Sequence, residues 1–143
     1  MHTAFSGLTR EGCPHAISDS VTHIGERLSN ELVSHYLCTT TNAHCVHSDT
    51  VIRTDGVAGA ATPLLKHTES LVKKHVQPLC DAGAIVLVPG FFGSDEAGQV
   101  QTLGRGGSDL TATVLGHALG ADLVTMWKVQ PSTSSSGAFR GWE

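Results

Sequence analysis

Apolar residues recur every three or four positions in two long stretches of the chain, which is the spacing of one face of a helix. The first stretch begins near Ile17, and Gly25 and Glu26 interrupt it, so we expect a helix, a break and a second helix. The second stretch begins at Pro63, which a first helical turn tolerates, and ends at Gly83. The apolar positions of the first stretch are Ile17, Val21, Ile24, Leu28, Leu32 and Leu37.

Three shorter segments have the composition of strands. Residues 84–88 form a continuous aliphatic and β-branched run that Pro89 stops, which is typical of a central strand buried on both faces of a parallel sheet. Residues 123–129 predict another strand. Residues 43–47 are compatible with a short strand that follows a turn.

A glycine-rich segment, residues 90–107, is too long to be a mere connector, and we expect it to be a functional loop. Ser108 and Asp109 then favour the N-cap of a helix that ends at Gly120. The order helix, strand, glycine loop, helix, strand is typical of a parallel α/β layer, in which ligands bind beyond the carboxyl ends of the strands. The glycine loop lies at that end.

Composition and charge narrow the classes of function. The 143 residues suit a single domain, and no apolar run approaches the roughly 20 residues of a membrane span. A formal net charge of -4 leaves no basic stripe for a phosphate backbone, so we expect neither nucleic acid nor a membrane as a partner. The start of the chain lacks the pattern of a secretory signal, and the four cysteines lack CxxC spacing. We therefore expect a cytoplasmic protein with reduced thiols.

The end of the glycine-rich loop carries groups that suit a zwitterion. A helix N-terminus offers backbone N–H groups and a partial positive charge to an anion. Arg105 adds a planar fork that can hold a carboxylate, and Asp109 offers a negative group to an ammonium or hydroxyl. The alternative is that Ser108 or Asp109 merely caps the helix and the glycines merely turn the chain.

The surrounding sequence resembles the aspartate kinases of the amino-acid kinase family. The resemblance lies in residues 88–93 (VPGFFG), 102–112 (TLGRGGSDLTA) and 118–122 (ALGAD), and it continues upstream in 25–29 (GERLS) and 52–55 (IRTD). It covers roughly residues 20–127. It implies a three-layer α/β/α sandwich with a mainly parallel sheet, the carbamate-kinase-like fold of that family, here incomplete.

The same resemblance implies an activity and a site. The activity is ATP-dependent phosphorylation of the side-chain carboxylate of L-aspartate to 4-phospho-L-aspartate, the first step toward lysine, threonine and methionine, with ATP and Mg²⁺ as cofactors. Arg105 resembles the clamp on the substrate carboxylate, and Glu26 the partner of its ammonium. Asp109 is the candidate catalytic residue, and the candidate substrate-binding residues are Glu26, Phe91, Arg105, Gly106, Gly107, Ser108 and Asp109.

The two ends of the chain depart from the family pattern. No Lys-Phe-Gly-Gly-Thr motif, whose lysine contacts the phosphates in this family, precedes Gly25, and no Thr-Asp-Val follows Trp127, so the cofactor-binding residues stay unassigned. We expect a loose leader over residues 1–15, a partial catalytic domain over 16–129 and a disordered Ser/Gly-rich tail over 130–143. Activity of the chain is then expected to be impaired. The alternative is a catalytically inactive amino-acid-binding module or subunit fragment. Possible partners of the chain are a second copy, in a homo-oligomer, or a longer subunit.

A metal site is a third hypothesis, because the chain has nine histidines and contains the string His44-Cys45-Val46-His47. On a strand, His44 lies on one face, whereas Cys45 and His47 lie on the other. At most two of the three candidate ligands therefore converge locally, and the sequence by itself favours no metal.

Overall fold

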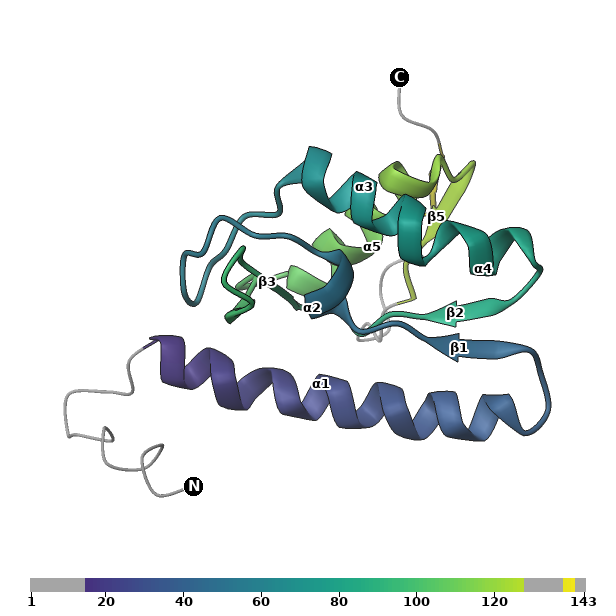
Figure 1. Cartoon of the computed structure of the whole chain (residues 1–143), viewed down its shortest axis with the longest axis horizontal. Coiled ribbons are helices and arrows are strands. Elements are labelled where there is room, and N and C mark those ends of the chain that lie inside the picture. Colours follow the sequence, from purple (N-terminus) through teal and green to yellow (C-terminus); the bar gives the residue numbers. More distant parts are fainter. Residues whose placement is uncertain (1–14, 128–137, 141–143) are drawn as a thin grey trace, which may run out of the picture.

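The first helix, α1 (His15–Cys38), is continuous. The computed structural model describes residues 15–127 and 138–140, and α1 is its longest helix (Figure 1). The predicted break at Gly25 and Glu26 is therefore wrong. A single glycine costs only about 1 kcal/mol inside a helix, and the packing of α1 along strands β1 and β4 outweighs that cost.

The side of α1 that faces the protein is polar. Asp19, His23 and Ser34 are buried, whereas Leu32 is 73% exposed and Leu28 is 59% exposed. An apolar stripe at helical spacing ordinarily faces the core, but here it faces outward within the described residues. The packing of α1 therefore depends on hydrogen bonds from polar side chains more than on apolar burial.

Strands β1 (Ala43–Cys45) and β2 (Ile85–Leu87) form a parallel pair, with Ala43 opposite Ile85 and Cys45 opposite Leu87. Both predicted strands and their parallel direction are confirmed. The expected burial of residues 84–88 on both faces is wrong for this chain. Ile85 is 50% exposed, because within the described residues β2 has β1 as its only paired strand.

The second predicted helix is divided into α3 (Leu65–His75) and α4 (Gln77–Asp81). Pro78 explains the division, since it has no backbone N–H to donate to the carbonyl four residues earlier. Gly83 then adopts a left-handed conformation, with φ of 73°, and the chain enters β2. The prediction of one helix from Pro63 to Gly83 is correct for the location and wrong for the continuity.

Part of the expected functional loop is a β-hairpin. Strands β3 (Phe92–Ser94) and β4 (Val100–Thr102) pair antiparallel, with Gly93 opposite Gln101. The segment after the short helix α2 (Ser48–Val51) runs parallel beside β3, and a Cβ on Gly93 would lie 2.6 Å from the carbonyl oxygen of Ile52. Only glycine allows this approach, and it fixes the hairpin against the core.

Helix α5 (Gly107–Leu119) follows the hairpin, and Gly120 ends it in the left-handed conformation, as predicted. The predicted N-cap is wrong, because Gly106 occupies that position and no side chain caps the helix. Strand β5 (Leu123–Thr125) pairs antiparallel with β6 (Ala138–Arg140), so residues 138–140 of the expected disordered tail form a strand. The rest of that tail, residues 128–129 before it and residues 1–14 of the expected leader lie outside the described residues.

These elements form three layers (Figure 1). Helix α1 lies on one side, β1, β2 and the hairpin lie in the middle, and α3, α4 and α5 lie on the other side. The expected α/β/α arrangement is confirmed in incomplete form. The core between the middle layer and α3 and α5 comprises Val51, Ile52, Val72, Val76, Val114 and Ala118. No helix in residues 15–127 is both long and apolar enough to cross a membrane.

Candidate functional site

A tight turn joins β4 to α5. Gly104 and Gly106 have φ values of 71° and 78°, which glycine adopts without the steric cost that a side chain adds. The backbone N–H of Gly107 donates to the carbonyl of Gly104 at 3.1 Å, and Arg105 lies exposed between them. The guanidinium of Arg105 makes no ion pair with a described residue, so it is available to an anion from solvent.

The loop after β2 packs directly against this turn. Phe91 has a φ of 80°, a strained value for a residue with a side chain. Its N–H donates to Oγ1 of Thr111 at 3.1 Å, and its carbonyl accepts from the N–H of Leu103 at 2.8 Å. A Cβ on Gly107 would lie 3.0 Å from the Phe91 ring. Phe91 is therefore held at the first turn of α5 from two sides.

The N-terminus of α5 gives the turn its electrostatic character. The first N–H groups of a helix have no intrahelical carbonyl to bond, and they carry a partial positive charge. Ser108 is exposed in this first turn, next to the half-buried Asp109, and Gly90 packs against it, since a Cβ there would lie 3.0 Å from Cα of Ser108. A carboxylate or a phosphate fits such a position.

Glu26 lies in another layer, on α1. It is exposed on α1, and no hydrogen bond or ion pair joins it to Arg105 or to another described residue. One turn earlier, the ring of His23 packs on that of Phe92, with centroids 5.1 Å apart. The structure thus brings Phe91, Gly106, Gly107 and Ser108 into one turn with Arg105 and Asp109, and it connects Glu26 only through the docking of α1 on the hairpin.

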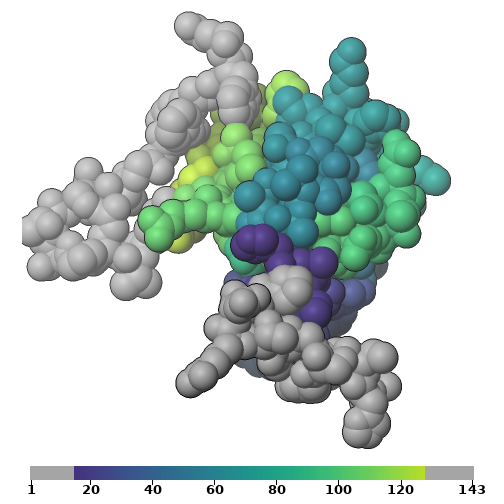
Figure 2. Space-filling view, turned by 90° about the vertical axis from the view of Figure 1, so that its left-hand side faces the viewer, coloured from purple at the N-terminus to yellow at the C-terminus, as the bar shows by residue number. Residues whose placement is uncertain are grey.

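Sequence reasoning missed Asp19, which fixes that docking. Its buried carboxylate accepts from the N–H of Gly59 at 2.7 Å and from Oγ1 of Thr102 at 2.6 Å. Figure 2 shows the start of α1, in purple, against the teal atoms directly above it. A signal was present, because polar residues recur at helical spacing opposite the apolar stripe, at Asp19, His23, Asn30 and Ser34.

A second polar group lies at the tip of the hairpin. The Asp95 carboxylate accepts from the N–H of Gln99 at 2.9 Å and from Nε2 of Gln101 at 2.9 Å. The hydrogen bond from Gln99, the largest cause, lowers the pKa of Asp95 below its usual value. The positive charge of Arg53 also lowers the pKa of Asp95, and the Arg53 guanidinium donates to Oγ of Ser94 at 3.1 Å.

This pKa shift predicts a dependence of stability on pH. Because the pKa of Asp95 is lower in the folded chain, its carboxylate stabilises the fold above the unfolded value of about 3.9. That contribution is lost as the pH falls through the folded pKa. Urea unfolding of Asp95→Asn at decreasing pH should therefore show a smaller loss of stability in acid than the unaltered chain. Glu96→Gln is the control, because it removes a negative charge from the neighbouring residue. If Asp95→Asn lost as much stability in acid as the unaltered chain, the prediction would be contradicted.

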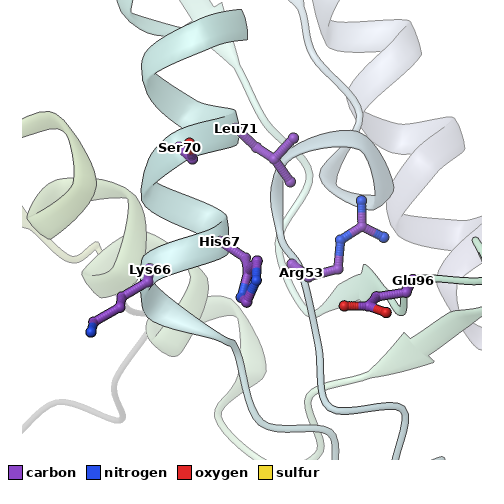
Figure 3. Close-up of a pocket in the computed structure, with 6 residues that line it drawn as sticks. All are labelled: Arg53, Lys66, His67, Ser70, Leu71 and Glu96. Atoms are coloured by element: carbon purple, nitrogen blue, oxygen red, sulfur yellow. The ribbon is translucent and has the colours of Figure 1, made fainter.

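Open cavities also lie elsewhere on the surface of the described residues, and two of them share Glu96. The larger, of about 570 Å³, is lined by Arg53, Lys66, His67, Ser70, Leu71 and Glu96 (Figure 3). Lys66 extends away from Arg53 and Glu96 in this view, and the Arg53 guanidinium already donates to the carbonyls of Ser94 and Asp95. The smaller, of about 440 Å³, adjoins it at Glu96. Neither cavity includes a predicted site residue, and the occupied guanidinium makes the larger one a weaker anion site than the turn at Arg105.

Known proteins resemble part of this chain. Lysine-sensitive aspartokinase 3 of Escherichia coli is 40% identical over 81 residues, which are 57% of this chain and 18% of the relative. An aspartokinase of Mycobacterium tuberculosis is 35% identical over 113 residues, which are 76% of this chain and 25% of the relative. The chain thus spans about a quarter or less of the length of these relatives.

Solved structures agree with the sequence comparison. E. coli aspartokinase III in complex with lysine and aspartate superposes with a TM-score of 0.73 and 32% identity, over 78% of this chain and 25% of that one. The same enzyme in complex with aspartate and ADP gives the same values. The model of the amino acid kinase family matches residues 3–131, so the match includes both the turn at Arg105 and helix α1. By this match, together with its fold, the chain belongs to the amino acid kinase family.

Proposed function

We propose that the turn before α5, with Phe91 and Glu26, binds L-aspartate as the substrate half of an aspartate kinase site. The observation that carries this proposal is the packing of strained Phe91 against Gly107, because it holds an aromatic ring, Arg105 and the α5 N-terminus in one place. A similar aspartokinase has been solved with aspartate bound, which supports the choice of ligand.

Each residue of the proposed site can bind a different group of aspartate. Arg105 would hold a carboxylate of aspartate through two parallel N–H donors, and the N–H groups of the α5 first turn would add to that attraction. Glu26 would pair with the substrate ammonium. Ser108 and Asp109 would orient the substrate, with Asp109 touching the reacting end, so that the side-chain carboxylate faces the phosphoryl donor.

The proposal that ATP with Mg²⁺ supplies the phosphoryl group rests on the family. Mg-ATP, when bound, provides the γ-phosphoryl group and much of the charge neutralisation that this transfer needs. Among residues 15–127, the lysines are Lys66, Lys73 and Lys74, and all of them lie on α3. The turn itself offers one cation, Arg105. The described residues therefore fit the amino acid better than they fit the nucleotide.

This distribution of cations favours a second candidate function, an amino-acid-binding module without phosphoryl transfer. The two functions differ in a direct measurement. Aspartyl phosphate formed from ATP by the purified 143-residue chain, at a rate that Asp109→Asn abolishes, would support the kinase. Aspartate binding without any turnover would support the binding module, and both results would retain the proposed amino-acid site.

Arg105→Ala should weaken L-aspartate binding about ten- to a hundredfold, as expected for loss of a charged, bidentate hydrogen-bonding partner. Isothermal titration calorimetry measures the change. Lys74→Ala is the matched control, since it also removes an exposed cation, from α3, and it should leave the affinity unchanged. Equal affinities of Arg105→Ala and the unaltered chain for aspartate would place the ligand elsewhere.

The assignment of Glu26 has its own test in the same experiment. Succinate has both carboxylates of aspartate but no ammonium, so the unaltered chain should bind it more weakly. Glu26→Gln should remove that preference by weakening aspartate and sparing succinate, whereas Glu96→Gln, at the cavity of Figure 3, should retain it. A preference for aspartate that survives Glu26→Gln would exclude this residue as the ammonium partner.

A further inference from the structure

Three metal-ligating side chains from two layers meet beside α1. They are Glu31 on α1, Cys45 at the end of β1 and His47 two residues later, and their ligand atoms all lie within 4.8 Å of one another. Nε2 of His47 is 3.1 Å from Oε1 of Glu31, and Nδ2 of Asn30 donates to Sγ of Cys45 at 3.1 Å. None of these three residues belongs to the proposed aspartate site.

The fold brings a third metal ligand to the two that the string 44–47 places together. Alternation along an extended chain places Cys45 and His47 on the same face and His44 on the other. Helix α1 packs on β1, and Glu31, fourteen positions before Cys45, supplies a third ligand to the first two. The expectation from sequence, that at most two ligands converge, holds for the string 44–47 and fails for the folded chain.

The donor set and its spacing fit a zinc ion. A thiolate, an imidazole and a carboxylate are ordinary zinc ligands, and bond lengths of about 2.0–2.3 Å place tetrahedral ligand atoms roughly 3.3–3.8 Å apart. The pair from His47 and Glu31 already lies close to that spacing, and small side-chain rotations would bring Sγ of Cys45 to it. Glu31 is exposed and the other two are half-buried, so an ion can enter from solvent.

Two buried polar atoms beside the cluster lack partners among the described residues, and neither is one of the three proposed ligand atoms. Nδ1 of His47 is buried and has no hydrogen-bond partner among the described residues, and Oδ1 of nearby Asp49 is in the same state. Buried polar atoms in folded proteins almost always have a partner. Arg27, whose positive charge acts on Cys45, is neutralised in part by its ion pair with Asp49 at 3.5 Å.

We propose that Glu31, Cys45 and His47 bind one Zn²⁺ ion, with water at a fourth position, and thereby tie α1 to β1. Binding replaces the thiol proton of Cys45, which passes to solvent, and uses neutral His47 and ionised Glu31. The ion would hold α1, the helix that carries Glu26, against strand β1 of the middle layer. A structural tie of this kind is independent of whether the turn at Arg105 binds aspartate.

Titration of the untagged, chelator-treated 143-residue chain with ZnCl₂ and with CoCl₂ tests the proposal. The Co²⁺ complex should show a thiolate-to-metal charge-transfer band, which reports a sulfur ligand directly. Cys45→Ser should abolish this band and weaken Zn²⁺ binding more than about a hundredfold, which exceeds the effect of losing a residue that only hydrogen-bonds a ligand. Cys80→Ser, which removes a free cysteine on α4, should retain both the band and the affinity.

The histidine and the glutamate are tested in the same way. His47→Ala and Glu31→Gln should each weaken Zn²⁺ binding, and His44→Ala, on the opposite face of β1, should not. Circular dichroism checks that each variant is folded. Because serine is nearly isosteric with cysteine, Cys45→Ser decides the matter if His47→Ala unfolds. Unchanged Zn²⁺ affinity in Cys45→Ser, or an equal loss in His44→Ala and His47→Ala, would overturn the proposal.

Discussion

Phe92→Ala should lower the free energy of unfolding by about 3–5 kcal/mol, the usual cost of removing a buried phenylalanine ring. Phe92 is completely buried, and its ring contacts that of His23 on α1. The cavity left behind would therefore open between the hairpin and the helix. Urea unfolding followed by circular dichroism measures the change. Since natural domains are stable by only about 5–15 kcal/mol, the variant should be close to unfolding at room temperature.

Leu32→Ala is the matched control for this prediction. Leu32 lies in the apolar stripe of α1 but is 73% exposed, so its truncation should change the free energy of unfolding by less than about 0.5 kcal/mol. A loss in Leu32→Ala as large as that in Phe92→Ala would contradict the described orientation of α1. It would mean that the apolar face of this helix is buried in solution.

Asp19→Ala should cost about 2–5 kcal/mol of stability, because it leaves one buried and one part-buried donor without their acceptor. The N–H of Gly59 and Oγ1 of Thr102 both donate to this carboxylate, from segments 40 and 83 positions away in the chain. Asp19→Asn should cost less than about 1 kcal/mol, since the amide oxygen can still accept from Gly59 and the amide nitrogen can donate to the Thr102 hydroxyl. Urea unfolding of the two variants side by side measures the difference.

The comparison of alanine with asparagine separates hydrogen bonding from charge. If both variants lost the same stability, the negative charge of Asp19 would matter more than its two acceptor oxygens. The two hydrogen bonds would then not account for the burial of this carboxylate. The result bears on function as well. Thr102 precedes the turn at Arg105 by three residues, so Asp19 helps to hold the proposed aspartate site against α1.

The sequence by itself determined the elements that depend on local chemistry. The aliphatic run before Pro89 became β2, the segment after Thr41 became β1, and Gly120 ended α5 in a left-handed conformation. The glycine-rich segment before α5 was also predicted, and its glycines at 104 and 106 adopt positive φ, which glycine tolerates because it has no Cβ. The predicted roles of Arg105, Asp109 and Glu26 stay predictions.

Only the tertiary structure decided which face of each element is buried and which distant residues meet. Helical spacing identifies the residues that share a face, but it does not say which face the rest of the chain covers. For α1 the polar face is covered, because Asp19 has partners near Gly59 and Thr102. In the same way Glu31 meets Cys45 and His47 because α1 packs along β1, a contact between segments that no local pattern of residues encodes.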